Sequence, residues 1–226
     1  MRFQYKTLET CSKAKSAVVV IDVLRAFSTA AYAFGAGAES ITLVSGVQEA
    51  LDLKAAIPGS LVMGEVGGIK VEAFDFGNSP AEFLNINLSG KALIQRTSAG
   101  TQGIVRARQA KTLLAASLCC ASATARYLSR VAPPSVAFVI TGAGHGEDGD
   151  EDLACAHYLE AILSDRLVAS EAYLQRVLKS PAGRIFADPE QPYFTPLDLE
   201  LCMQVDRFDF AMHVEREDGR LVMRPR

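Results

Sequence analysis

Four glycines and three chemically distinctive side chains, Glu65, Lys70 and Asp75, occur together in the segment Gly64–Pro80, GEVGGIKVEAFDFGNSP. Glycine has no Cβ, so the backbone can adopt positive φ and approach a ligand closely. Loop amides that carry fixed acids and a base beside them suit an oxyanion or a metal ion. The structural alternative is a long surface turn, and the segment alone does not decide between them.

Three further polar segments, 22–25, 96–101 and 142–152, each follow a run of apolar residues. The apolar runs read as buried strands, because AVVVIDV and VAFVIT are continuous β-branched or aromatic stretches. In open α/β sheets ligands bind outside the carboxyl ends of the strands. If the sheet is parallel there, these three segments should converge with Gly64–Pro80.

Together the four segments carry carboxylates, two arginines, hydroxyls and many glycine amides. Carboxylate oxygens suit Mg²⁺, which is usually held by a few of them together with water and substrate phosphate. Arginine side chains and loop amides suit phosphate oxygens. The pattern therefore predicts metal-assisted phosphoryl chemistry, with these candidate acids: Asp22, Glu65, Asp75, Glu147, Asp148, Glu151 and Asp152.

A structural role is the alternative for each candidate. Asp22 would then cap a turn, with Arg25 as its surface partner, and Lys70 would pair with Asp75. His145 is either a general acid or a bystander in its loop. Four residues near one strand end would form a turn or helix caps: Arg96, Thr97, Ser98 and Thr101.

Composition narrows the function classes. The net charge of −3, with no block of Lys or Arg, argues against a nucleic-acid partner. The N-terminus MRFQYKTLET lacks the apolar core of a signal peptide, and no apolar run approaches the roughly 18 residues of a membrane span. We therefore expect no membrane partner and a cytoplasmic location. The five cysteines include no C-x-x-C pair, which favours reduced thiols over a disulfide framework or a zinc site.

Apolar runs and helical patterns alternate along most of the chain, which predicts an α/β fold with three α/β/α layers and a mixed, largely parallel sheet. The strands are expected at 17–23, 40–44, 61–63, 92–95, 112–116 and 136–141. A hairpin around Asp218-Gly219 is expected at one edge of the sheet. Residues 1–226 should form a single domain. The range 181–196 is the only candidate boundary, and it is better interpreted as a long loop.

Four strings, IDVLRAFSTA, GEVGGIKVEAFDFGNSP, RTSAGTQG and EDLACA, occur here in the order and spacing of the 2-phosphosulfolactate phosphatase family, which the chain resembles over nearly its whole length. The resemblance implies a Mg²⁺-dependent hydrolase that removes phosphate from 2-phospho-3-sulfolactate, a step towards coenzyme M, on a compact α/β fold. Ala99 departs from the asparagine that family members often carry before Gly-Thr. The C-terminal third resembles the family least.

The resemblance and the loop chemistry together give a working hypothesis for the site. Mg²⁺ would be held by Asp22, Glu65 and one of Glu151 or Asp152. Asp75 would be the general base, Arg96 would clamp the phosphate with the amides of 98–101, and Arg25 would bind the carboxylate or sulfonate. We assign catalytic roles to Asp22, Arg25, Asp75 and Arg96, and substrate binding to Lys70, Asn78, Ser79, Thr97, Ser98, Gly100 and Thr101.

Two alternatives stay open at this stage. The substrate could be another small phosphorylated 2-hydroxy acid, or the chain could bind a phosphometabolite without turning it over. In each case the expected partner is a small anionic phosphoester. The sequence leaves open whether the chain forms a homo-oligomer.

Overall fold

The first predicted strand is β2 (Ala17–Ile21) in the computed structural model, which describes residues 1–144, 147–167 and 169–226. All five of its residues are buried. Val18 and Val20 pack into one apolar cluster and Val19 and Ile21 into another, on opposite faces of the sheet. A continuous apolar run is therefore what a strand covered on both faces requires.

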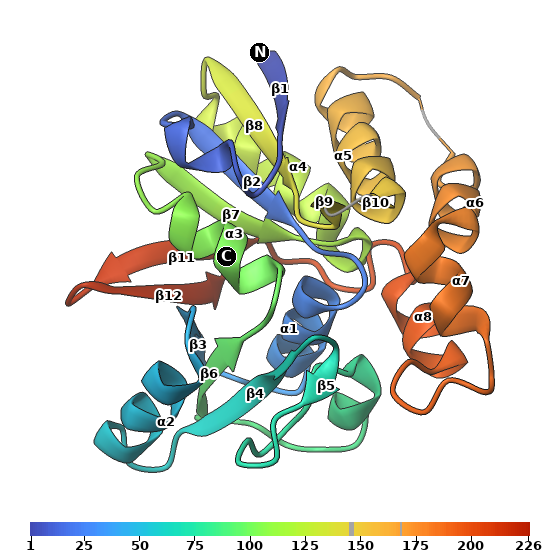
Figure 1. The fold of residues 1–226 in the computed structure, drawn as a ribbon. Helices are drawn as coiled ribbons and strands as arrows, with labels where there is room; N and C mark the ends of the chain where they lie inside the picture. Colours follow the sequence, from blue (N-terminus) through green and yellow to red (C-terminus); the bar gives the residue numbers. More distant parts are fainter. Residues whose placement is uncertain (145–146, 168) are drawn as a thin grey trace.

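Ten strands form one sheet, in which two parallel blocks are separated by a hairpin (Figure 1). The first block contains, in spatial order, β1 (Arg2–Lys6), β8 (Ser135–Ile140), β2 and β7 (Thr112–Ala116). The second contains β3 (Ser40–Val44), β6 (Ala92–Arg96) and β4 (Leu61–Val66), with β5 (Ile69–Lys70) antiparallel at the outer edge. The predicted mixed, largely parallel sheet is confirmed.

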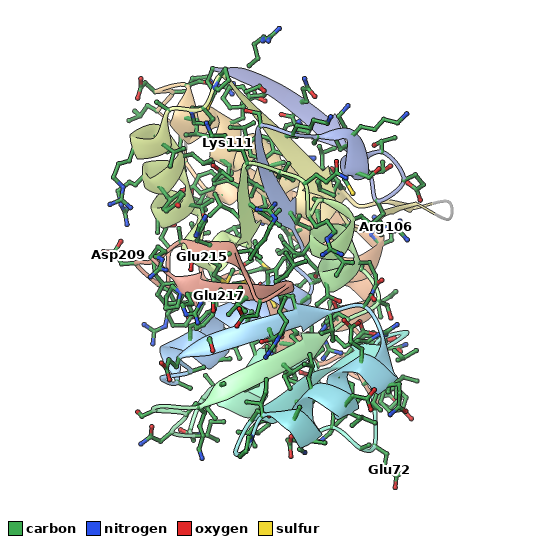
Figure 2. All side chains as sticks on the ribbon, turned by 90° about the vertical axis from the view of Figure 1, so that its left-hand side faces the viewer. Glu72, Arg106, Lys111, Asp209, Glu215 and Glu217 are labelled. Carbon is green, nitrogen blue, oxygen red and sulfur yellow. The ribbon has the colours of Figure 1, made fainter. Side chains whose placement is uncertain are left out.

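The C-terminal hairpin consists of β11 (Met212–Glu217) and β12 (Arg220–Pro225), joined at Asp218-Gly219. The turn was predicted correctly, but its place at a sheet edge was wrong. β11 pairs with β7 and β12 pairs with β3, both antiparallel, so the hairpin joins the two blocks. Figure 2 shows it between the blocks, with Glu215 and Glu217 labelled.

This insertion reverses the second block. Chain direction changes at three successive ladders between β7 and β3, so β3, β6 and β4 run opposite to β2 in the order of the sheet. Neighbouring strands also rotate by about 20–25° each, and the five steps from β2 to β6 add roughly 100–125°. The blocks therefore cross instead of lying side by side, and the carboxyl ends of β2, β4 and β6 meet next to α1 (Ala26–Gly35) (Figure 1).

Helices cover both faces of the sheet. α1 and α3 (Gly100–Arg106) pack on one face, and α4 (Ala121–Val131) and α5 (Asp150–Leu163) pack on the other face of the first block. α2 (Val47–Ala56) covers the second block through Ala50, which packs with Val62 and Ile94. The three-layer α/β/α architecture is confirmed.

The C-terminal third adds α6 (Glu171–Lys179), α7 (Pro181–Ala187) and α8 (Pro196–Cys202), stacked along one side of the molecule (Figure 1). The range 181–196 is therefore not one long loop, since its first part is α7, which buries Phe186 in the core. The short elements are η1 (Cys11–Lys13), η2 (Pro80–Phe83), η3 (Leu118–Cys120), β9 (Ala143–Gly144) and β10 (Glu147–Asp148).

Two predictions from composition can be compared with the fold. All five cysteines are free and buried, and burial raises the pKa of the Cys119 thiol to about 12. Within the described part of the chain, no helix has both the length and the apolar character needed to cross a membrane.

Candidate active site

A pocket of about 270 Å³ lies where the segments after β2, β4 and β6 meet α7. Three of the four predicted polar segments line the pocket, and the fourth, 142–152, meets the segment after β2 through the bond from the Val23 amide to Asp152. The pocket lining combines polar and apolar side chains. The predicted site residues that line it are Asp22, Arg25, Glu65, Asn78 and Ser98; the other lining residues are Leu24, Gly67, Gly68, Ala99, Ala182, Ile185, Phe186 and Phe194.

Glu65 is buried near the end of β4, and its carboxylate is held by loop donors. The Gly68 amide donates to Oε2 at 2.6 Å, and the Ser98 amide donates to Oε1 at 2.5 Å. The Ser98 hydroxyl donates to Oε2 at 3.0 Å. A carboxylate has about four lone-pair positions. Three donors fix the orientation of Glu65 and leave acceptor capacity towards the pocket.

Asp22 is buried at the end of β2 and receives the amide of Ala26 on Oδ1 at 2.8 Å. The predicted alternative, a capping acid, is therefore part of its role, since Ala26 is the first residue of α1. Burial raises the pKa of Asp22 to about 6, and the nearby negative charges of Glu65 and Glu151 add to that rise. Three acidic groups thus lie close enough to repel one another.

Asn78 lies on the pocket wall at the far end of the glycine-rich segment and is 8% exposed. Its Oδ1 atom is buried and accepts no hydrogen bond from the described part of the chain. Leaving a buried oxygen without a donor is unfavourable. Asn78 is therefore a lining residue whose buried oxygen has no hydrogen-bond partner among the described residues.

Arg25 is buried against the rings of Phe186 and Phe194, whose centroids lie 5.1 and 5.2 Å from its Cζ atom and 5.1 Å from each other. Its Nη1 donates to Asp198 Oδ2 at 2.7 Å, and its Nη2 donates to the Gly68 carbonyl at 3.2 Å. The predicted alternative, a surface ion pair of Arg25 with Asp22, is wrong. Arg25 is a buried cation on the pocket wall, paired with Asp198.

Four predicted residues at the end of β6 and the start of α3 lie next to the pocket but are not among its lining residues. Thr97 and Thr101 donate their amides to each other's hydroxyl groups at 2.9 and 3.0 Å, which ties the end of β6 to the first turn of α3. Arg96 donates to the carbonyls of Glu65 and Ser45, so it ties the loops together. A Cβ on Gly100 would lie 2.8 Å from Asp22 Oδ2. Only glycine allows this close approach.

Asp152 is buried at the start of α5, and its carboxylate accepts four donors. These are the Val23 amide at 2.8 Å, the Gly142 amide at 2.9 Å, and the Thr141 amide and hydroxyl at 3.1 Å. Burial, followed by the charges of Glu151 and Asp22, raises the pKa of Asp152 well above its usual value. Three of these contacts fall on Oδ2 and one on Oδ1, so this geometry favours a cross-link between β2, β8 and α5 over a metal ligand.

Two predicted residues do not reach the pocket. Asp75 bonds both carboxylate oxygens to Lys54 Nζ at 2.7 Å and accepts the Val62 amide at 2.7 Å. Lys70 donates to the Asp75 carbonyl at 2.9 Å, so the predicted Lys70–Asp75 ion pair is replaced by Lys54–Asp75. This position does not support Asp75 as general base or Lys70 as a substrate contact. His145, the candidate general acid, lies outside the described residues.

The remaining two predicted residues have different surroundings. Ser79 donates its hydroxyl to Asp198 Oδ1 at 2.6 Å, next to Asn78. Glu151 is buried at the start of α5, where its carboxylate lies against Gly142. Ser79 supports the pocket wall from behind, and Glu151 contributes negative charge near Asp22.

The donor set fits an open magnesium site better than a closed cage. Over residues 1–144, 147–167 and 169–226, no three His, Cys, Asp or Glu side chains gather closely enough to hold a metal ion by themselves. Asp22, Glu65 and Asn78 nevertheless line one pocket, and the side-chain oxygen of Asn78 is unsatisfied among the described residues. Mg²⁺ typically keeps several waters and binds through one or two carboxylates plus substrate phosphate. These three oxygen donors fit that pattern.

Sequence reasoning missed three residues of the site: Phe186, Phe194 and Asp198. The two rings form the apolar wall beside Arg25, and Asp198 is its charge partner. One local signal marks Asp198. Thr195 precedes it by three residues, a spacing typical of a helix start, and Thr195 Oγ1 accepts the Asp198 amide at 3.2 Å. That signal predicts the start of α8 but not the contact with Arg25.

Fold and pocket together define a class of protein: an α/β enzyme with a small, acid-lined site where strand ends meet. Comparison with known proteins identifies the family. The family model for 2-phosphosulpholactate phosphatase matches residues 3–217. The chain is 35% identical to a probable 2-phosphosulfolactate phosphatase of Bacillus subtilis, over 90% of this chain and 88% of that one.

Two further relatives carry the same name. The Carboxydothermus hydrogenoformans protein is 35% identical over 92% of this chain and 90% of its own length. The Thermus thermophilus protein is 34% identical over 80% of this chain and 72% of its own length. The chain therefore belongs to the 2-phosphosulpholactate phosphatase family, and the predicted membership of a family of phosphoric monoester hydrolases is confirmed.

Proposed function

We propose that this protein is a Mg²⁺-dependent phosphatase that hydrolyses 2-phospho-3-sulfolactate to 3-sulfolactate and phosphate. The observation that carries the proposal is the grouping of Asp22, Glu65 and the unsatisfied Asn78 oxygen in one pocket with Arg25, in a chain of this family. The reaction would be a step towards coenzyme M.

The charges of the pocket support a metal-dependent reaction. Asp22 and Glu65 would repel a phosphate group, and the one arginine on the wall already has a buried carboxylate partner. When bound, Mg²⁺ would stabilise negative charge on the phosphoryl oxygens. Asp22, Glu65 and Asn78 would hold it, while the waters and the phosphate complete the coordination.

The protein's own contribution is positioning. Hydrolysis of a phosphomonoester depends mainly on orientation and on charge stabilisation, with little covalent chemistry for side chains to perform. Ser98 and Ala99 line the pocket, and we propose that their loop receives the phosphate. Arg96 keeps that loop against Glu65 through the bond from Nη1 to the Glu65 carbonyl at 2.6 Å. Arg25 would receive the carboxylate or sulfonate.

The test is phosphate release from synthetic 2-phosphosulfolactate with Mg²⁺, with EDTA, and with Mg²⁺ restored. We expect release only when Mg²⁺ is present. Release that is unchanged in EDTA would contradict the magnesium assignment. Tight Mg²⁺-dependent binding with no release over hours would instead identify a binding protein.

One observation favours a second substrate, another small phosphorylated 2-hydroxy acid. The pocket lining includes the apolar side chains of Leu24, Ala182, Ile185 and the two phenylalanines. Such apolar side chains accept a methyl or larger alkyl group more readily than a sulfonate. Comparing kcat/KM for 2-phosphosulfolactate and 2-phospholactate in the same assay separates the two candidates.

A further inference from the structure

Asp198 is a fully buried carboxylate at the start of α8 that bonds to two separate site segments. It accepts Arg25 Nη1 on Oδ2 at 2.7 Å. Its other oxygen, Oδ1, accepts the Ser79 hydroxyl at 2.6 Å and the Ala81 amide at 3.4 Å. One side chain of the C-terminal third therefore joins the segment after β2 to the end of the glycine-rich segment.

Arg25 is restrained on several sides. Phe186 and Phe194 stack on its guanidinium group, Asp198 takes one donor and the Gly68 carbonyl takes another. A guanidinium group has five N–H donors in a rigid plane. The described residues accept two of them, and Arg25 also lines the pocket. Donors are left for an anionic group in the pocket.

We propose that Asp198 is a positioning residue that aims Arg25 at the non-transferred acidic group of the substrate. The proposal rests on the proposed function, since it assigns one part of the same substrate to Arg25. An arginine side chain has many rotamers, and binding an anion in one geometry is more favourable when that geometry is already fixed. The carboxylate fixes the guanidinium plane, and the two rings keep it from tilting.

A purely structural ion pair is the competing explanation, and it makes a different prediction. Loss of a structural pair would disturb the whole pocket, so every phosphomonoester would be affected to the same degree. Loss of a positioning residue would affect only substrates that have a second acidic group. The matched substrates are 2-phospholactate and isopropyl phosphate, which differ only by carboxylate against methyl.

The experiment measures kcat and KM of Asp198→Asn on both esters with Mg²⁺. We expect KM for 2-phospholactate to rise about 10- to 100-fold, the range for one hydrogen-bonded charged contact. On isopropyl phosphate we expect a change of less than about threefold. Glu200→Gln is the matched control, because Glu200 is an exposed acid on the same helix. It should behave as the wild type on both esters.

Equal losses on both esters, or no loss on either, would overturn the proposal. If Asp198→Asn does not fold, Asp198→Glu keeps the charge and shifts the carboxylate by one methylene. This variant should show a smaller rise in KM for 2-phospholactate and again little change for isopropyl phosphate. If the wild type releases phosphate from neither ester and also not from 2-phosphosulfolactate, the proposed function fails. Calorimetric Kd values for the two esters then decide the role of Asp198 by the same selectivity.

Discussion

Glu65 and Asp75 stand towards opposite ends of one glycine-rich segment, and each carboxylate accepts a backbone amide. Glu65 is 5% exposed and lines the pocket, and among the described residues its carboxylate accepts two loop amides and one hydroxyl. The Asp75 side chain is 27% exposed, lies outside the pocket and is paired with Lys54. The comparison indicates that an acid in this glycine-rich segment is available to the site when no lysine or arginine side chain already pairs with it.

The largest expected effect concerns the glycines beside these acids. A Cβ on Gly64 would lie 1.8 Å from the Arg96 carbonyl, at a φ of +133°. We expect Gly64→Ala to lower the free energy of unfolding by on the order of 3–5 kcal/mol. The backbone at residue 64 and the backbone at Arg96 would both have to shift. Gly77→Ala would meet only the flexible Glu82 carboxylate at 2.6 Å and should lose far less. Urea unfolding of both variants checks this, and similar losses would contradict the contrast.

The next effect concerns the pocket acid itself. Glu65→Gln keeps the size of the side chain but removes the charge proposed to hold Mg²⁺, so kcat/KM should fall at least about 100-fold. Gln has one acceptor oxygen, so its NH₂ group would face either the Ser98 or the Gly68 amide, and urea unfolding of the variant is the control for local loss of structure. Steady-state kinetics over a Mg²⁺ titration measures the fall in kcat/KM. Wild-type activity with wild-type Mg²⁺ dependence would remove Glu65 from the site.

A smaller effect is expected for the acid at the other end. Asp75→Asn breaks a partly exposed pair with Lys54 and weakens the bond to the Val62 amide, which should cost about 1 kcal/mol. The kcat/KM value should stay within about threefold of wild type. Lys54→Met is the partner control and should lose a similar amount of stability. A 100-fold loss of activity in Asp75→Asn would restore Asp75 as a catalytic candidate.

The smallest expected effect is the pH dependence of the stability that the Lys54–Asp75 ion pair contributes. Burial tends to raise the pKa of Asp75, but the Lys54 bond and the Val62 amide outweigh it, so the pKa lies below its usual value. The contribution to stability is therefore full above the unfolded pKa of about 3.9 and is lost as pH falls through the folded pKa. The difference between wild type and Asp75→Asn should shrink from pH 7 to pH 3. Urea unfolding at both values measures it, and a difference that grows towards pH 3 would contradict the ion pair.

Local patterns in the sequence predicted much of the fold. The strands 40–44 and 112–116 have the predicted bounds, and the hairpin turns at Asp218-Gly219 as expected. Apolar periodicity and turn residues act over a few residues, so the sequence shows them directly. The same reasoning placed Asp22, Glu65, Asn78 and Ser98 in the site, because each follows or closes a segment after a strand.

Contacts between residues far apart in the sequence determined the remaining features of the sheet and the site. Nothing local indicates that β11 and β12 enter the middle of the sheet and reverse the second block. Lys54 reaches Asp75 from α2, 21 residues earlier, and Asp198 reaches Arg25 from 173 residues later. The sequence alone indicated the alternating strands and helices between residues 17 and 162 and which acids were available for chemistry, but not β1 or α7. Only the tertiary structure decided which acids meet a cation and which meet the pocket, because charge pairing depends on contacts that the linear pattern does not encode.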